Sequence, residues 1–305
     1  MLRLIVARLV QLPLVLAVVF LVTFTLVWVL PGSPLDRPDG RRMPPAVERA
    51  MQQRYNLDSP GSFLTGYVSG LVRGDLGPSL EYPGREVRQI IGEGLRVSVS
   101  LGLAALVVAL VLGTVAGVVG ALRPGSPLDS ASLGVALLGI SLPNFVTGTV
   151  LLVLFAGVLN WFPIGGWTSP AAVVLPAVTL GLAPAAYIAR LIRLGLADVM
   201  SADYLRTARA KGLSHSAALF KHALKVAYLP VLSFLGPAAA SVMTGSFVVE
   251  KVFNLPGLGE YFVNSVLNKD QSLILGIVLV YATMLILFNL VVDVAYAWID
   301  PRIEL

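Results

Sequence analysis

A stretch of 60 consecutive residues, from Ser130 to Ala189, contains no Asp, Glu, Lys, Arg or His. A helix crosses the roughly 30 Å hydrocarbon core of a bilayer with about 20 apolar residues, so this stretch is too long for one crossing. It suits two membrane-spanning helices with a connection between them. We predict the connection at Asn160–Trp167, where Pro, Gly and two Trp residues are typical of a turn at the membrane surface.

The composition of the whole chain agrees with a membrane protein. Of its 305 residues 56% are apolar and 13% are charged, against about 25% charged in an average globular chain. The mean hydropathy is +0.83. These values exclude a water-soluble globule and a disordered chain. The chain has no cysteine, which excludes disulfides, thiolate zinc sites and iron–sulfur clusters.

Charge-poor stretches of similar length recur along the chain and predict an all-α integral membrane protein with six transmembrane helices. The first lies within residues 1–30 and is expected to stay uncleaved. Its 22 uncharged residues from Leu9 to Leu30 exceed the core of a signal peptide, which has roughly 7–15 residues. The other five spans are expected at about 97–122, 133–158, 170–189, 226–249 and 271–292. Gly and Pro residues inside the spans would permit close helix packing and kinks; they are Gly113, Gly117, Gly120, Pro143, Pro176 and Pro184.

The distribution of basic residues predicts the orientation. If the N-terminus is cytoplasmic, the cytoplasmic segments hold eleven Lys and Arg residues, whereas the two short outer loops hold only Lys251 and Lys269. Basic residues favour the cytoplasmic side, although loops longer than about 60 residues largely escape the rule. Both termini, including the tail 297–305, are therefore expected in the cytoplasm.

The long outer segment, residues 31–96, is expected to form an extracytoplasmic cap between the first two spans. Pro44–Tyr55 has the composition of a helix that begins at a proline, and Gly70–Pro83 is rich in turn-forming residues. Nine Arg and eight acidic residues nearly cancel, so the segment is not a polyanion-binding patch. A simple cover and a docking surface for something delivered from outside both remain open.

The inner segment 190–225 carries the charge excess of the protein. It holds seven Lys and Arg residues and two Asp residues, an excess equal to the net charge of +5 of the whole chain. Within it, Ser201–Asp203 can cap a short helix that Gly212 ends. Ala208 and Gly212 are small and four residues apart, so a partner could approach closely. The alternative is an ordinary basic loop that obeys the topology rule.

No catalytic motif accompanies these features. The chain lacks a phosphate-binding P-loop, an H-E-x-x-H metal motif and a G-x-S-x-G nucleophile motif. His215 and His222 lie seven residues apart with no acidic cluster, which is not the spacing of a metal site. The spans lack the ionisable groups of a proton-coupled carrier and the nucleophile–base pair of an intramembrane enzyme. A structural scaffold also stays open as an alternative.

Six motifs in order along the chain resemble those of ABC importer membrane subunits. More narrowly, they are similar to the first ("B-type") permease of the dipeptide/oligopeptide/nickel group, most like a dipeptide permease. The motifs are Leu30–Pro34, Arg73–Ser79, Gly139–Phe145, Tyr204–Ser214 with Lys221–Leu224, Val249–Gly259 and Asp293–Arg302. The resemblance runs over nearly the whole chain. It implies a type I ABC importer permease fold with a transmembrane core from about 94 to 296 that includes the coupling loop 190–225.

The resemblance also implies a site. In the wider family the inner loop contacts a cytoplasmic ATPase, and its pattern E-A-A-x-x-x-G aligns on Gly212. Arg206 and Thr207 replace the Glu and first Ala, as is common in the peptide subgroup, while Lys225 replaces a later Pro. The implied ATPase-coupling helix consists of Asp203, Tyr204, Arg206, Thr207, Ala208, Arg209, Ala210, Lys211 and Gly212.

The function implied by the resemblance is ATP-driven uptake of di- or oligopeptides across a bacterial cytoplasmic membrane, in a chain that is not itself an enzyme. The expected partners are a homologous second permease, two ATPase subunits, an extracytoplasmic substrate-binding protein and membrane lipid, but no nucleic acid. No catalytic or metal residue and no bound cofactor is expected, because ATP and magnesium would belong to the partners. Nickel chelates, glutathione and haem are alternative substrates, and an ion-coupled secondary transporter is a further alternative.

Overall fold

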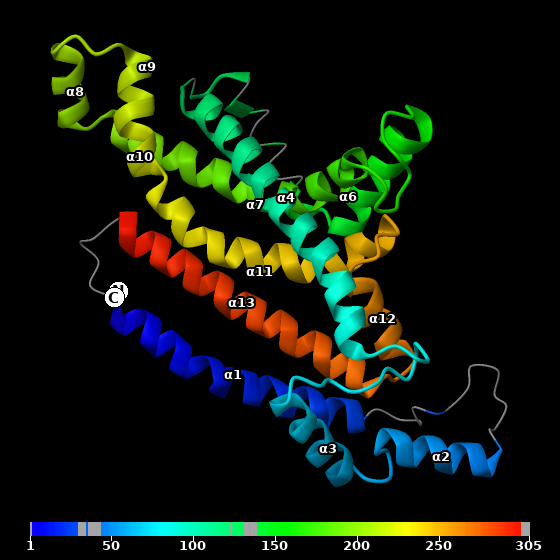
Figure 1. Ribbon diagram of the computed structural model, residues 1–305. Helices are drawn as coiled ribbons and strands as arrows, with labels where there is room; N and C mark the ends of the chain where they lie inside the picture. The colour runs from blue at the N-terminus through cyan, green and yellow to red at the C-terminus, as the bar shows by residue number, and fades with distance from the viewer. Residues whose placement is uncertain are drawn as a thin grey trace. The chain divides into compact units, whose positions relative to one another are not determined.

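The computed structural model describes residues 2–29, 35, 44–122, 124–127, 129–130, 134 and 139–299. The described chain is helical, and its only extended pairing is an isolated bridge between Pro78 and Glu86 (Figure 1). Parts of four predicted segments lie outside the described residues. They are residues 30–34 and 36–43 around the start of the cap, 133 and 135–138 of the third span, and 300–305 of the tail.

The chain divides into two compact units. The first unit comprises residues 98–255 together with residues 1–5 and 287–305, and the second unit comprises residues 6–97 and 256–286. Three helices contribute to both units: α1 (Leu2–Val29), α4 (Val87–Leu122) and α13 (Gln271–Ile299).

The first unit is built mainly from long apolar helices. Besides most of α4, its elements are α6 (Asn144–Leu151), the π-helical η1 (Leu152–Val158), α7 (Pro170–Met200), α8 (Asp203–Ala210), α9 (His215–Ala218), the π-helical η2 (Leu219–Ala223), α10 (Leu224–Ala227) and α11 (Leu229–Val252). One cluster of buried side chains joins α4, α7, α8, η2 and α11, with Ile188, Ile192 and Leu196 of α7 fully buried at its centre.

Small residues let α4 and α7 approach each other closely. A Cβ atom added at Gly113 would lie 2.7 Å from the carbonyl oxygen of Ala185, and one at Gly117 would lie 2.7 Å from that of Ala189. No side chain fits at either position without a shift of the backbone. The predicted packing role of the two glycines is therefore confirmed, in line with the small-residue contacts that hold membrane helices together.

We predict that Gly113→Ala destabilises the first unit by about 1–3 kcal/mol, because the added methyl group overpacks the contact with α7. Thermal unfolding of the purified protein in detergent measures this. Gly102→Ala is the matched control on the same helix, since its nearest neighbour would be Val242 Cγ1 at 3.9 Å. A Gly113→Ala protein as stable as the control would contradict the proposed close contact.

The second unit contains shorter helices beside parts of α1, α4 and α13. These are α2 (Pro45–Tyr55), α3 (Pro60–Val72) and α12 (Leu258–Leu267). The predicted helix start at the Pro44–Pro45 pair is confirmed, and a capping box between Ser59 and Ser62 begins α3. An aromatic cluster holds α1 against α3: the ring of Tyr67 stacks on Phe20 and on Phe63 with centroid distances of 5.7 and 5.8 Å.

Among the described residues, five helices are long and apolar enough to cross a membrane: Arg8–Val29, Val87–Leu122, Pro170–Met200, Leu229–Val252 and Gln271–Ala295. Asn144–Val158 is shorter and belongs to the expected third span. Several helices run past the predicted limits. α4 begins ten residues before the expected span, and α7 continues to Met200, so Arg190 and Arg193 lie on a helix and not in a loop. Charge marks where a helix leaves the hydrocarbon, but it does not end the helix.

Candidate functional site

The predicted coupling helix forms as α8, an eight-residue helix with defined ends. Its N-cap is Ala202, whose side chain cannot cap, and the hydroxyl of Ser201 instead donates to the carbonyl of Asp198. The N-cap thus lies inside the predicted capping segment Ser201–Asp203, but no side chain of this segment forms a cap hydrogen bond. At the other end, Gly212 N–H donates to Arg209 and Leu213 N–H donates to Ala208, with Gly212 at a φ of +92°. This is a Schellman motif, and it explains why glycine follows the helix.

A single residue ties α8 to the rest of the first unit. Leu205 is the only buried residue of α8, and it lies in the cluster formed by α4, α7, η2 and α11. Leu213, just past the Schellman turn, packs on the same cluster. Figure 1 shows α8 and α9 side by side, beyond the end of α7. Leu205 thereby joins α8 to the helices of this cluster.

The remaining predicted coupling residues lie on the outer surface of this hairpin. Ala208 is half-buried, whereas Asp203, Tyr204, Arg206, Thr207, Arg209, Ala210, Lys211 and Gly212 are exposed. Tyr204 is 48% exposed, and nothing lies within 4 Å of a Cβ atom added at Gly212. Arg206 is 3.6 Å from Asp203, but an ion pair this exposed contributes little to stability.

Sequence reasoning missed an exposed aromatic residue in η2, which follows α8 and α9 in the chain. Phe220 lies on η2 and is 62% exposed, next to the exposed Lys221 and His222. The sequence places this Phe beside Lys221 and His222, but its exposure depends on tertiary packing. π-helical turns inside helices are frequent at functional sites. We define Tyr204, Arg206, Arg209 and Lys211 as the α8 surface: one aromatic ring among three cations.

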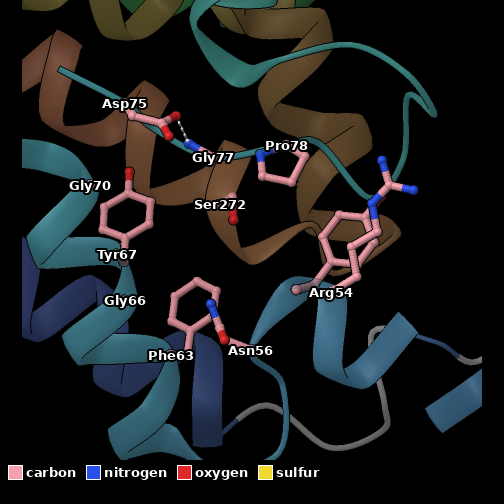
Figure 2. Close-up of a pocket in the computed structure, with 11 residues that line it drawn as sticks. Arg54, Asn56, Phe63, Gly66, Tyr67, Gly70, Asp75, Gly77, Pro78 and Ser272 are labelled. Atoms are coloured by element: carbon pink, nitrogen blue, oxygen red, sulfur yellow. Dashed lines mark hydrogen bonds between the residues drawn. The ribbon is translucent and has the colours of Figure 1, made fainter. Parts of the chain in front are cut away.

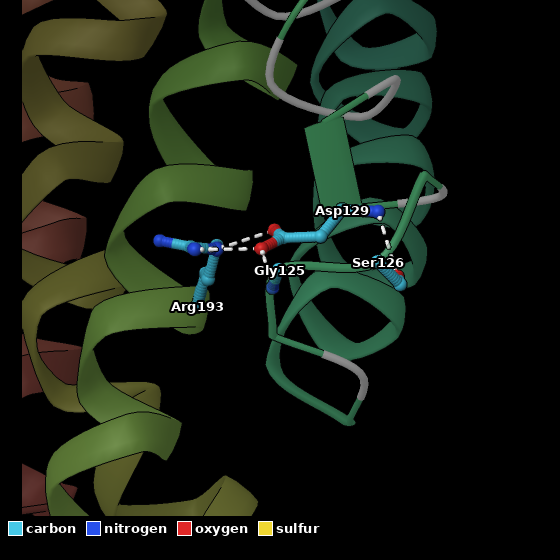
Figure 3. Close-up of polar contacts among 4 residues, drawn as sticks. All are labelled: Gly125, Ser126, Asp129 and Arg193. Carbon is cyan, nitrogen blue, oxygen red and sulfur yellow. Dashed lines mark hydrogen bonds and ion pairs between the residues drawn. The ribbon is translucent and has the colours of Figure 1, made fainter.

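An ion pair fixes the segment that follows α4 to α7, as Figure 3 shows. Arg193 donates from Nε and Nη2 to the two carboxylate oxygens of Asp129 at 2.7 and 2.8 Å. Asp129 is 3% exposed and also accepts from the Gly125 N–H at 2.9 Å. Such bidentate arginine–carboxylate contacts are directional as well as strong. The Arg193 guanidinium, together with Gly125, holds the pKa of the Asp129 carboxyl below its ordinary value.

This pair predicts a pH dependence. Because the pKa of Asp129 is lowered in the folded protein, its contribution to stability is present above the unfolded-state pKa of about 3.9 and is lost as the pH falls through the folded-state pKa. Asp129→Asn should lower the unfolding temperature at pH 7. The difference from the unmodified protein should vanish in acid, below the folded-state pKa. An equal difference at both pH values would show that the charge is not what stabilises this contact.

A second carboxylate organises the turns of the cap. Asp270 is fully buried just before α13, where it caps the helix by accepting from Leu273 N–H at 3.1 Å. Its other oxygen accepts from the Ser79 hydroxyl and from the N–H groups of Leu80 and Glu81, at 2.9 and 3.1 Å for the two amides. Four donors thus converge on one carboxylate. This accounts for Ser79 at the end of the motif Arg73–Ser79.

A third buried carboxylate lies at the end of α11. Glu250 is fully buried and accepts a 2.7 Å hydrogen bond from the Ser98 hydroxyl on α4. The turn that follows places the Phe253 carbonyl where it accepts from Gly166 N–H at 3.0 Å. A Cβ atom at Gly165 would lie 2.4 Å from the same carbonyl oxygen, so the predicted turn at Asn160–Trp167 needs its glycine.

Among the described residues, no group of three or more His, Asp or Glu side chains could hold a metal ion. The buried carboxylates are each committed to hydrogen bonds with neighbouring helices and turns. Arg193 with Asp129, and Ser79 with Asp270, connect segments far apart in the sequence. The described part of the chain therefore consists of apolar helices that are connected by ion pairs and hydrogen bonds near their ends. The α8–α9 hairpin is exposed and basic.

Comparison with known proteins identifies the family to which this chain belongs. Residues 101–305 match the family described as "binding-protein-dependent transport system inner membrane component". The chain belongs to this family: it is a multi-pass transport permease subunit and not an enzyme. Membership implies an ATPase and a substrate-binding protein as partners.

Individual relatives narrow the class to the peptide permeases. The dipeptide transport system permease protein DppB of Bacillus subtilis (strain 168) is 43% identical over 289 residues, which cover 94% of this chain and 93% of the relative. The oligopeptide transport system permease protein OppB of Haemophilus influenzae (strain ATCC 51907 / DSM 11121 / KW20 / Rd) is 41% identical over 309 residues and covers 100% of both chains. The resemblance inferred from the six motifs is thereby confirmed.

Solved structures support the fold. The inward-facing MetNI methionine ABC transporter (CY5 native crystal form) superposes with a TM-score of 0.55 at 16% identity, over 70% of this chain and 97% of that one. An amino acid ABC transporter crystallised with histidines gives a TM-score of 0.53 at 18% identity, over 68% and 94% of the two chains. The chain has the type I ABC importer permease fold.

Proposed function

We propose that this chain is the channel-forming permease of an ATP-driven importer of di- and oligopeptides. The observation that carries the proposal is the similarity of 40–43% identity, over 94–100% of the chain, to the dipeptide and oligopeptide permeases. The uncharged spans suit a path that tolerates varied peptide side chains. Nickel chelates, glutathione and haem are the competing substrates within the same architecture.

The proposed architecture has six spans. The third is placed at about 133–158, and the helices found by length and composition supply the other five. Both termini and the segment 190–225 would be cytoplasmic, and residues 31–96 would form the extracytoplasmic cap. The transporter core would run from about 94 to 296. The excess of basic residues in the cytoplasmic segments supports this orientation.

The α8 surface is proposed as the contact with a cytoplasmic ATPase. The buried Leu205 holds this helix to the first unit. Tyr204 and the basic residues Arg206, Arg209 and Lys211 are exposed. The residues proposed for coupling are Asp203, Tyr204, Arg206, Thr207, Ala208, Arg209, Ala210, Lys211 and Gly212. When ATP draws two ATPases together, each would carry its helix with it. Leu205 would pass that movement to the core of the permease, and the membrane cavity would turn outward.

The proposed assembly contains a second, homologous permease, since one chain of this size cannot enclose a peptide path alone. Two ATPases and an extracytoplasmic binding protein complete it. ATP and magnesium would be bound by the ATPases and not by this chain.

Uptake of a radiolabelled dipeptide into proteoliposomes tests the proposal. The vesicles would contain this chain with the second permease and the ATPases encoded alongside it, and the binding protein would be added outside. We expect uptake that requires both ATP and the binding protein and that unlabelled di- and tripeptides suppress. Nickel chelates, glutathione and haem should not compete. A binding protein that takes only a metal chelate would overturn the peptide assignment. Uptake that survives ATP depletion but stops with an uncoupler would indicate a secondary transporter.

A further inference from the structure

The second unit contains a polar cavity that no step of the proposed transport cycle uses. It has a volume of about 160 Å³ and lies among α2, α3, the turn after α3 and the start of α13. Figure 2 shows its lining side chains, among them Arg54, Asn56, Tyr67, Asp75 and Ser272. Every lining residue belongs to the second unit.

One buried hydroxyl group in this cavity, that of Tyr67, lacks a hydrogen-bond partner within the described part of the chain. Tyr67 is 7% exposed. Ser272 is 6% exposed, and Figure 2 shows its hydroxyl among the lining side chains. Burial raises the pKa of Tyr67, so this hydroxyl keeps its proton at neutral pH. Leaving a buried hydroxyl unpaired costs about 1–3 kcal/mol, so an occupant that forms a hydrogen bond with the Tyr67 hydroxyl is favoured.

The rim of the cavity carries one positive and one negative side chain. Arg54, at the end of α2, stacks over the Tyr55 ring at 5.9 Å and forms no ion pair among the described residues. Asp75 uses one carboxylate oxygen to accept from Gly77 N–H at 2.8 Å, and its second oxygen makes no further bond to the described chain. In Figure 2 the two charged groups stand on opposite sides of the cavity. A ligand with charges of both signs would therefore match the rim.

The size of the cavity limits the ligand. A drug-sized ligand needs roughly 300–1,000 Å³, whereas this cavity has about 160 Å³. A volume of this size suits a molecule as small as a single small amino acid.

We propose that this cavity binds a free small amino acid as a zwitterion. Its ammonium group lies toward Asp75 and its carboxylate toward Arg54, while the hydroxyls of Ser272 and Tyr67 satisfy the remaining hydrogen bonds. All residues of this site belong to the second unit and none is among those proposed for coupling, so the proposal does not depend on the proposed function.

Equilibrium binding of radiolabelled glycine and alanine to the full-length protein in lipid nanodiscs tests the proposal, together with any subunits that copurify. Acetate and ethylamine are the probes that carry only one of the two charges. We expect saturable binding of both amino acids and no competition from either single-charge probe. Arg54→Gln, Asp75→Asn and Ser272→Ala should each raise the Kd by about 3- to 10-fold, as expected for the loss of one hydrogen-bonding or charged group.

Two exposed positions of the same unit provide matched controls. Arg49→Gln and Asp58→Asn remove the same charges away from the cavity and should leave the Kd unchanged. The proposal is overturned if glycine shows no saturable binding, if acetate or ethylamine displaces it, or if the three cavity variants bind as the controls do. Dipeptide uptake measured on the same variants separates the two proposals, because losing this site should leave the transport assignment intact.

Discussion

Replacing Gly212 with tryptophan is expected to stop substrate uptake while membrane insertion and ATP hydrolysis persist. Gly212 has a φ of +92° and open space around it, so its role is to end α8 and to leave the surface beyond it clear. A non-glycine residue in this left-handed conformation costs roughly 1–2 kcal/mol, and an indole would project from the proposed ATPase contact. A loss of ~1.4 kcal/mol in the free energy of docking weakens the affinity for the ATPase about tenfold. We therefore expect the rate of substrate uptake to fall at least about tenfold.

Gly212→Asn is the matched control for this change. Asparagine tolerates the left-handed conformation better than other side chains and is much smaller than tryptophan. It should retain most of the uptake. Both variants are compared in proteoliposomes by dipeptide uptake and by ATP hydrolysis in the same vesicles. Normal uptake by Gly212→Trp would refute the role of the α8 surface, and equal loss in both variants would mean that the Schellman turn alone matters.

Replacing Asp270 with alanine is expected to produce the largest loss of stability in the second unit. The change would leave the Ser79 hydroxyl and three N–H groups without their acceptor in a buried site. Removing one partner from such a buried charged network costs about 3–5 kcal/mol. We therefore expect a large fall in the unfolding temperature and faster proteolysis of the turns around Ser79.

Asp58→Ala provides the comparison, because Asp58 is an exposed acid of the same unit. It should change the unfolding temperature little. Asp270→Asn should fall between the two, since an amide oxygen can accept part of the donor set but the amide nitrogen cannot. If Asp270→Ala unfolds like the Asp58→Ala control, the four hydrogen bonds do not hold the turns in place.

Several features of the fold followed from the sequence because they depend on local composition. The apolar runs predicted the long helices, and the proline at the start of α2 and the glycine after α8 predicted those ends correctly. Helix ends governed by tertiary contacts were less predictable. α7 continues past Arg190 because Ile192 and Leu196 bury their side chains in the core of the first unit. The charge pattern alone could not reveal that burial.

The candidate site likewise combines features that local composition predicts with features that depend on tertiary contacts. The basic residues of α8 were found from charge and from the spacing of small residues, and the structure places most of them on one exposed helix. Phe220 was missed, because its exposure depends on how η2 packs against α7. The cavity beside Ser272 was also missed, since its lining residues come from sequence positions that are separated by some 200 residues.

By itself, the sequence determined that this protein spans a membrane, which family motifs it carries, and where its excess positive charge lies. Each of these properties depends on residues that are close together in the sequence. The membrane spans follow from the hydropathy of about 20 consecutive residues, and the charge excess follows from the number of basic residues in one loop. Only the tertiary structure decided that Leu205 anchors α8, that Arg193 binds Asp129, and that Asp270 collects four donors. The contacts of Arg193 with Asp129 and of Ser79 with Asp270 join segments that are distant along the chain. Their partners are fixed by packing geometry, which no local pattern of residues encodes.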